Sequence, residues 1–304
     1  MTRSDVAGDV RPNDVMRYRP KLLGLAYRML GDMDDAEDAV QEAFLRWHES
    51  DRADIRSAEA WLVTVVTRIS VDRLRRAATE RASYIGPWLP EPIATEPPST
   101  YPAPDREAEL ASDLSVALLV LLERLAPEER AAFLLREVFG TPYEEIARIL
   151  DRRQDAVRQM VHRARTRVHE QRPRVPTPPD LHEKLLERFL AAVAADDAPA
   201  LLELLAPEVV LVTDGGGVVR AARRVMTGVD AVARTLLALA RKFGARYTRR
   251  LTWLNGQPAI VQHVEDRIDS VIMIAPGDDG IGAVYVIRNP EKLRRVLATE
   301  SAVE

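Results

Sequence analysis

The spacing of apolar residues predicts helices over the first half of the chain and a mixture of helices and strands over the second. In 34–47 and 59–76, apolar side chains recur every three or four residues, which is the period of one helix face. Residues 112–125 and 127–140 continue the helical pattern. Further helices are predicted at 181–195, 198–205 and 230–241, and strands at 209–213, 246–254, 259–264, 270–274 and 283–288. The last part is therefore expected to be an α+β domain with an antiparallel sheet.

Two proline-rich stretches, 87–105 and 172–180, interrupt these patterns. Proline lacks an amide donor and disfavours helix at the preceding residue, so both stretches are expected to be linkers. We expect domains at 12–83, 112–171 and 181–304, joined by linkers at 84–111 and 172–180. The fold class is thus multidomain, with two all-α domains followed by one α+β domain.

The amino-acid composition excludes several classes of site. The chain has 304 residues and no cysteine, which excludes disulfides, thiolate metal sites and a cysteine nucleophile. No apolar run approaches the length of a membrane span, and the N-terminus lacks the apolar stretch of a signal peptide, so we expect a cytoplasmic protein. The net charge of −4 says little about partners, because basic and acidic residues are segregated along the chain.

Residues 141–168 predict a helix-turn-helix: a short helix to about Leu150, a turn at 151–153 and a longer helix from Gln154. Eight arginines and two acids lie between 152 and 174. Arginine and glutamine on the outer face of such a helix can reach base edges, which favours DNA binding over a merely solvated face. The residues expected to reach DNA are Gln154, Arg158, Gln159, His162 and Arg163.

A second segment, 32–47, holds six acids between Asp32 and Glu42 and no base among them. Acids early in a helix favour its dipole, which is a purely structural explanation. On a DNA-binding protein, however, an acidic face repels phosphate and suits a protein-docking surface. A metal site would require ligands in register, and His48 alone is weak support, so no metal and no cofactor are expected.

The helix at 59–76 carries several arginines together with an aromatic ring and small polar groups, a combination that suits melted nucleic acid. Trp61 can equally be a core residue. Asp72 is expected to orient a neighbouring arginine by an i,i+3 or i,i+4 pair.

Taken together, DMDDAEDAVQEAFLRW (32–47), AWLVTVVTRISVDRLRR (60–76) and LAPEERAAFLLREVFGTPYEEIARILDRRQDAVRQMVHRARTRV (125–168) resemble an extracytoplasmic-function sigma factor of the sigma-70 family. The resemblance implies that 12–83 is sigma region two and 112–171 is region four. It implies binding to core RNA polymerase, at the β′ clamp helices and the β flap, and to promoter DNA. The residues that would dock on the β′ clamp helices are Asp35, Asp38, Gln41 and Glu42.

The same resemblance assigns promoter recognition to two surfaces. The helix-turn-helix would read the upstream promoter element. The loop at about 50–57 and the following helix would recognise and melt the downstream element, with Trp61, Thr64, Thr67, Arg68, Asp72, Arg75 and Arg76. The resemblance implies that many relatives have asparagine where this chain has Arg68, so the family's promoter choice at that base does not carry over to this chain.

Three further motifs resemble sigma factors that carry a fused SnoaL-like domain with the NTF2-like cone fold: YIGPWLPEP (84–92), TDGGG (213–217) and VIRNPEKLRRV (286–296). The resemblance implies regulation in cis by this domain and no separate anti-sigma factor. The residues expected to take part are Trp88, Leu89, Pro90, Glu91, Pro92, Asp214, Gly215, Gly216, Gly217, Asn289, Pro290, Glu291, Lys292 and Leu293.

Physical chemistry suggests how these motifs meet. Trp88 and Leu89 are apolar anchors in a polar linker and need a pocket. The glycines at 215–217 permit unusual backbone angles and close approach, and Asp214 can hydrogen-bond that loop. We expect the helix from Glu291 to have a basic side. The hypothesis is that WLPEP packs on the C-terminal domain near DGGG or NPEKL.

Two other functions remain open at this point. The C-terminal domain could be an enzyme, with His263, Glu265, Asp266 and Asp214 as acid–base candidates, although a lone histidine beside acids is more often structural. The whole chain could be a ligand-responsive repressor, which would leave the acidic helix and the 59–76 helix unexplained. An unknown small molecule in the cone is compatible with either alternative or with a sigma factor.

Overall fold

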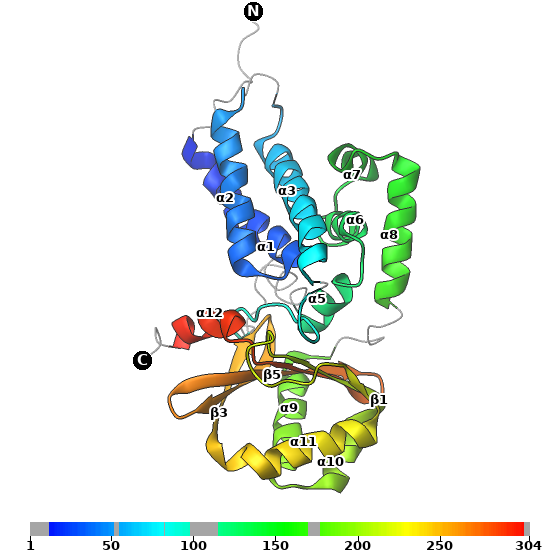
Figure 1. The fold of residues 1–304 in the computed structure, drawn as a ribbon. Coiled ribbons are helices and arrows are strands. Elements are labelled where there is room, and N and C mark those ends of the chain that lie inside the picture. Colours follow the sequence, from blue (N-terminus) through cyan, green and yellow to red (C-terminus); the bar gives the residue numbers. More distant parts are fainter. Residues whose placement is uncertain (1–11, 52–54, 82, 98–114, 170–176, 301–304) are drawn as a thin grey trace, which may run out of the picture. The chain divides into compact units, whose positions relative to one another are not determined.

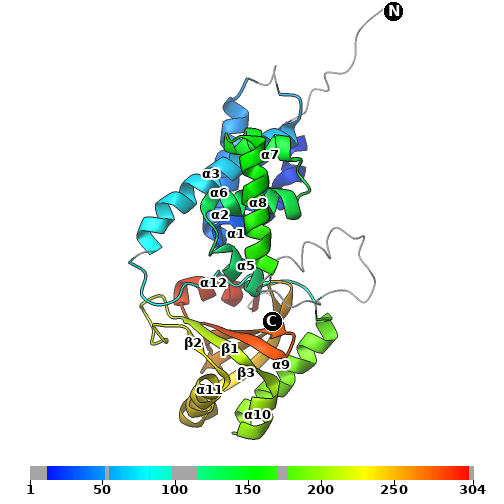
Figure 2. The ribbon, with the colours of Figure 1, turned by 90° about the vertical axis from the view of Figure 1, so that its right-hand side faces the viewer.

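The computed structural model describes residues 12–51, 55–81, 83–97, 115–169 and 177–300. Two compact units result: one holds residues up to Ala78 together with Leu125–Ala164, and the other holds Thr79–Arg124 together with the chain from Arg165 (Figures 1 and 2). In the part of the chain described, no helix is both long and apolar enough to cross a membrane.

The first unit is helical, as the apolar periodicity predicts. Its elements are a 3-10 segment η1 (Pro12–Tyr18), then α1 (Arg19–Leu30), α2 (Met33–Glu49), α3 (Ala58–Arg81), α6 (Pro127–Glu137), α7 (Tyr143–Leu150) and α8 (Gln154–His169). Asp32 caps α2 by accepting the Asp35 N–H at 3.0 Å. Buried Arg130 of α6 donates to the Met29 carbonyl at the end of α1, which ties the two parts of this unit together.

The helix-turn-helix is formed by α7 and α8. The turn depends on Asp151, whose left-handed backbone (φ 51°, ψ 55°) ends α7 and lets its N–H return to the Ala147 carbonyl. Val157, Val161 and Ala164 of α8 are buried, as predicted for the inner face. The opposite face is polar and exposed.

The second unit combines helices with a six-stranded sheet. Its elements are α5 (Val116–Leu122), α9 (Pro179–Ala194), α10 (Ala198–Leu204), β1 (Leu205–Asp214), β2 (Met226–Thr227), α11 (Val229–Phe243), η2 (Gly244–Arg246), β3 (Tyr247–Leu254), β4 (Gln257–Val264), β5 (Arg267–Gly277), β6 (Gly280–Ile287) and α12 (Pro290–Glu300). The strand order is β2-β1-β6-β5-β4-β3. The α+β class is therefore confirmed.

The expectation of a wholly antiparallel sheet was wrong in one place. β3 to β6 form an antiparallel meander, but β1 pairs with β6 in parallel, with Leu211 opposite Val284. Local patterns specify strands and their hairpins but not the pairing of strands some seventy residues apart. The short strand β2 was also missed, because two residues show no alternation.

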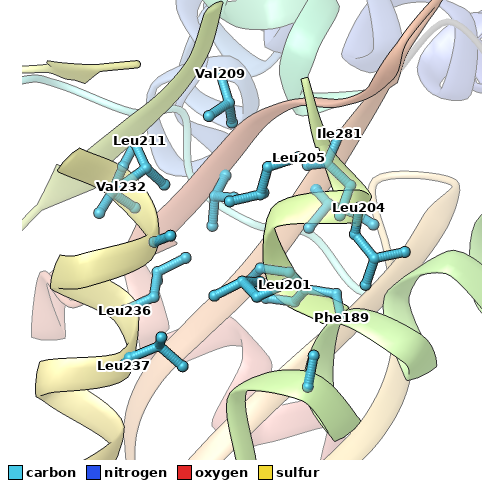
Figure 3. Close-up of a cluster of buried hydrophobic side chains, with 14 of the residues drawn as sticks. Phe189, Leu201, Leu204, Leu205, Val209, Leu211, Val232, Leu236, Leu237 and Ile281 are labelled. Carbon is cyan, nitrogen blue, oxygen red and sulfur yellow. The ribbon is translucent and has the colours of Figure 1, made fainter. Parts of the chain in front are cut away.

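Each face of the sheet is covered by different elements. The concave side carries an apolar cluster built from α9, α10, α11 and the strands, in which side chains such as Phe189, Leu201 and Leu236 point toward one another (Figure 3). The opposite side carries a second cluster, which includes Leu89 of the linker, Val116 of α5 and Leu293 of α12. The chain that precedes the domain thus helps to cover its sheet.

α5 belongs to this second unit, through Val116 and its neighbours, although the sequence assigns it to region four. Residues 98–114 and 170–176 lie outside the described residues, as do 52–54 of the predicted promoter loop. The domain boundaries near these segments therefore stay predictions.

His182 of α9 contacts the sheet. Because its ring is buried, we expect the stability of the C-terminal domain to fall in acid. The ring is buried, with Nε2 3.0 Å from the Ile274 carbonyl oxygen. Burial lowers the pKa of His182, so the folded state favours the neutral ring. Stability is thus present above the ordinary histidine pKa of about 6.5 and is lost as the pH falls below it.

We expect the denaturation midpoint of the full chain to fall as the pH drops below about 6.5, and His182→Gln to flatten that fall. His48→Gln, at an exposed position of α2, is the control and should keep the wild-type slope. Equal slopes in the wild-type chain and the His182→Gln variant would show that His182 is not the titrating group.

Candidate functional sites

The predicted polymerase-docking residues lie along one side of α2. Asp35, Asp38 and Gln41 are exposed and Glu42 is half-buried. Arg73 of α3 faces this acidic row, 3.0 Å from Asp35 and 3.8 Å from both Asp38 and Glu42. Burial and the nearby charge of Asp32 raise the pKa of Asp35, while Arg73 opposes that rise. The acidic side chains therefore remain exposed to solvent, and their ion pairs with Arg73 hold them in position.

The first turns of α3 form a pocket of about 400 Å³ in the helical unit. Trp61, Thr64 and Arg68 line it, together with residues that precede α3 and residues of α7. Trp61 is half-buried and packs edge-to-face on Trp47, with ring centroids 5.4 Å apart. Three of the seven predicted downstream-element residues are thus brought together around one hollow.

Arg68 is already engaged in this structure. Its Nε donates to the Ile149 carbonyl at 2.8 Å and its Nη2 to the Arg148 carbonyl at 3.0 Å, both at the end of α7. Cations at a helix C-terminus are stabilised by the unpaired carbonyls. Arg68 therefore fastens α3 to the helix-turn-helix.

The remaining predicted residues of α3 lie further along the helix. Asp72 pairs with Arg75 at 2.9 Å, as the i,i+3 spacing predicts, and Arg75 also reaches Glu128 of α6 at 2.5 Å. Arg76 is exposed. These side chains form a mixed, largely exposed ion network rather than a purely basic face.

Thr67 requires a correction. The resemblance predicts that it holds promoter DNA, but its side chain is fully buried and its hydroxyl donates to the Val63 carbonyl at 2.7 Å. Threonine inside a helix often makes this i−4 bond. Thr67 is a packing residue here and does not face a ligand.

The predicted upstream-element residues lie on the outer face of α8. All five are exposed: Gln154, Arg158, Gln159, His162 and Arg163. Arg163 pairs with Glu129 of α6 at 3.1 Å, and the Arg158 guanidinium lies 5.6 Å from the centroid of the Tyr143 ring. Of the five side chains, Gln154 and Gln159 are therefore the least constrained by such contacts.

The third predicted site is assembled around one carboxylate. Asp214, at the end of β1, is completely buried. Its Oδ1 accepts from the Tyr84 hydroxyl at 2.6 Å and the Gly216 N–H at 2.9 Å. Its Oδ2 accepts from the Leu89 N–H at 2.9 Å and from the Lys292 ammonium at 2.6 Å. All three motifs thus converge on Asp214.

Lys292 supplies the matching charge. Its ammonium also donates to the Leu89 carbonyl and lies 4.0 Å from the centroid of the Trp88 ring. A cation over an indole ring is attracted by the ring quadrupole, more strongly when it is desolvated. The expected basic side of α12 is therefore wrong for Lys292, which points inward and is buried, whereas Arg294 is exposed.

The segment 84–95, called the strap below, has a second anchor that the sequence analysis missed. Buried Asn255, in the β3–β4 turn, accepts the Ile93 N–H with its side chain and donates its own N–H to the Ile93 carbonyl. Thr95 N–H bonds to the Trp253 carbonyl, and Ala94 pairs with Leu254 as an isolated bridge. The strap therefore crosses the sheet from the end of β1 to edge strand β3.

Between its contacts with Asp214 and Asn255, the strap is packed against the C-terminal domain. Leu89 is fully buried, and Pro90, Glu91 and Pro92 are also buried. Glu91 lies 3.5 Å from Arg295 of α12. The hypothesis that WLPEP packs on the C-terminal domain is confirmed, and it meets DGGG and NPEKL together rather than one of them. Leu293 lies in the same apolar cluster, whereas Pro290 and Glu291 are exposed.

Tyr84 and Asn289 close the polar end of the strap. The Asn289 side chain donates to the Tyr84 hydroxyl at 3.2 Å. Burial and the adjacent Asp214 raise the pKa of Tyr84, so the phenol stays protonated and keeps donating to that carboxylate. The sequence signals for these two residues are that Tyr84 is the first residue of the YIGPWLPEP motif and that Asn255 follows a predicted strand.

Each of the three glycines at 215–217 is needed for a different structural reason. Gly216 and Gly217 adopt positive φ of 64° and 74°, and an added Cβ on Gly217 would lie 3.1 Å from Ile85 of the strap. An added Cβ on Gly215 would lie 2.4 Å from the Val219 carbonyl oxygen. An added Cβ on Gly216 would meet the Asn289 side chain at 2.5 to 2.8 Å.

Gly216→Ala should therefore destabilise the second unit by about 2–4 kcal/mol, from left-handed strain plus the displacement of Asn289. Gly140→Ala is the matched control, since Gly140 has the same φ of 64° and nothing within 4 Å. It should cost only the strain, about 1 kcal/mol. Denaturation of both variants measures the difference, and equal losses would show that the Asn289 contact does not matter.

Comparisons with known proteins agree with this geometry. Residues 15–80 match Sigma-70 region 2 and residues 115–168 match Sigma-70 region 4. These are the two helical segments that carry the acidic row, the pocket and the helix-turn-helix.

Relatives extend over nearly the whole chain. ECF RNA polymerase sigma factor SigJ of Mycobacterium tuberculosis is 37% identical over 284 residues, covering 90% of each chain. Probable ECF RNA polymerase sigma factor SigI of the same species is 34% identical, covering 91% of this chain and 92% of its own. The crystal structure of SigJ matches with a TM-score of 0.73 at 34% identity, over 92% of this chain and 98% of that one. The chain belongs to the ECF sigma factors of the sigma-70 family.

Proposed function

We propose that this sigma factor binds core RNA polymerase through the acidic row of α2, recognises and melts specific promoters, and is regulated in cis by its C-terminal domain through the strap. Family membership supports the first two parts. The observation that carries the third is the buried Asp214–Lys292 pair, which holds Leu89 and Trp88 against the C-terminal domain.

The strap can act as a regulator for a physical reason. It lies in the stretch that separates region two from region four in the sequence. Fixing residues 84–95 on the C-terminal domain shortens the chain left free to set the separation of the two regions, so docking or release changes which spacings they can adopt. This arrangement supports internal control without a separate anti-sigma factor.

The other two functions receive less support from the site. The concave side of the sheet is packed with apolar side chains, the environment that Figure 3 illustrates. Of the acid–base candidates, Asp214 is engaged by four donors, and Glu265 and Asp266 are exposed in the β4–β5 turn. A repressor alone leaves the acidic row and the pocket without a role.

The test of polymerase binding is charge reversal in the acidic row. Asp38→Arg should weaken binding to purified core RNA polymerase about tenfold or more, because a like charge placed across an interface costs several kcal/mol. Glu203→Arg, an equal charge change at an exposed site of α10, is the control and should bind as the wild-type chain does.

Run-off transcription provides a second measurement of the effect of Asp38→Arg. The wild-type chain with core enzyme should initiate at discrete sites of a genomic template library, and Asp38→Arg should initiate less at limiting sigma. Failure of the wild-type chain to support initiation on any template would refute the proposed function.

A further inference from the structure

The C-terminal domain has a segregated charge distribution that the proposed function does not use. Between Gly215 and Val264 there are nine basic residues and one acid, Asp230. The second part of this stretch, 231–264, has no acid at all. Its basic residues are Arg234, Arg241, Lys242, Arg246, Arg249 and Arg250.

The fold places these residues on adjoining elements. α11 buries Val232, Leu236 and Leu237 against the domain, so its outer face carries Arg234 and, two turns later, Arg241. η2 adds Arg246, and edge strand β3 adds Arg249 and Arg250. We call this set, Arg234 to Arg250, the basic edge. Figure 1 shows the chain running from α11 to β3, and η2 lies between these two elements.

Most of the basic edge is available to a ligand. Arg249 is half-buried and the other five are exposed. Arg241 pairs with Asp196 at 3.3 Å. Within the described residues, Lys242, Arg246 and Arg249 have no ion-pair partner; Lys242 instead lies over its neighbour Phe243.

Helix chemistry explains part of this pattern but not all of it. Arg241 and Lys242 stand in the last turn of α11, where cations favour the helix dipole. Arg234 stands two turns earlier, and Arg246, Arg249 and Arg250 follow the helix. The helix dipole therefore does not account for Arg234, Arg246 or Arg249.

The shape of the outer face suits an extended polyanion. Ala231, Thr235 and Ala238 line a shallow depression on α11 together with Arg234 and Leu239. Arg234 and Arg241 are about 10 Å apart along the helix axis. One DNA strand advances about 3.4 Å per phosphate, so this distance covers about three phosphates.

We infer that the basic edge binds the phosphate backbone of duplex DNA, as a sequence-independent contact of the C-terminal domain. The inference rests on the proposed function, since promoter binding by the sigma regions would bring the covalently linked C-terminal domain to DNA. Arginine and lysine without fixed partners supply phosphate neutralisation, which adds affinity and salt dependence but no base readout.

The test compares Lys242→Gln/Arg246→Gln with Lys184→Gln/Arg188→Gln, an equal charge change at exposed positions of α9. Each full-length chain is titrated, without polymerase, into a labelled 40-base-pair duplex of random sequence, from 50 to 200 mM salt. If two phosphate contacts are lost, the slope of log K against log salt falls by about 1.8. The wild-type chain should then lose about tenfold more affinity than the variant over this range, and the α9 control should behave as wild type.

Equal slopes for Lys242→Gln/Arg246→Gln and wild type would overturn the inference, and so would an equal fall in the α9 control. Unchanged slopes with weaker binding to core RNA polymerase would assign the basic edge to a protein partner instead. A reduced slope in a chain that does not initiate transcription would support the basic edge while refuting the proposed function.

Discussion

Asp214→Asn is expected to release the strap and to destabilise the C-terminal unit by about 3–5 kcal/mol, the usual cost of breaking a buried ion pair. The substitution keeps the shape of the side chain but leaves the Lys292 ammonium buried without its counter-charge. The asparagine amide also cannot replace both carboxylate oxygens, which accept two donors each.

Hydrogen exchange provides the direct measurement. In the wild-type chain the Leu89 amide is protected by Asp214, whereas in Asp214→Asn the amides of residues 84–95 should exchange faster. Asp266→Asn is the control; this residue is exposed in the β4–β5 turn and should change stability by less than about 0.5 kcal/mol. Unchanged protection of Leu89 in Asp214→Asn would show that the ion pair does not hold the strap.

Leu89→Ala should cost about 2–5 kcal/mol through loss of apolar burial and the cavity that remains. Leu89 is fully buried in the cluster that covers the sheet opposite the concave side, beside residues of β5, β6 and α12. Unlike Asp214→Asn, this change leaves every polar contact of the strap possible. It therefore separates the apolar contribution from the ionic one.

Ile85→Ala serves as its comparison within the same strap. Ile85 is 53% exposed, and its truncation should cost under about 1 kcal/mol. Both variants are measured by denaturation and by hydrogen exchange of residues 84–95. If Leu89→Ala loses no more stability than Ile85→Ala, then Leu89 does not anchor the strap.

Much of this arrangement could be predicted from the sequence, because local patterns determine it. The 3.6-residue period located α2, α3 and α9, and the strand-like runs located β1 and β3 to β6. The motifs around Trp88, Asp214 and Lys292 identified the strap and its partners, although not the geometry in which all three meet.

What could not be predicted depends on long-range pairing. Arg73 seemed to belong with the basic residues of α3, yet it turns toward the acids of α2, because the packing of the two helices decides which way it points. Thr67 is polar in sequence but buried in the fold. The parallel pairing of β1 with β6 and the role of Asn255 join residues that are distant in the chain.

We propose that the strap controls this sigma factor. The most direct measurement is run-off transcription with purified core RNA polymerase, comparing the wild-type chain, Asp214→Asn and Asp266→Asn at equal concentrations. We expect all three to require core enzyme, Asp266→Asn to match wild type, and Asp214→Asn to differ several-fold in yield or to use different start sites. If Asp214→Asn releases the strap by hydrogen exchange yet initiates at the same sites with the same yield, control through the strap is contradicted.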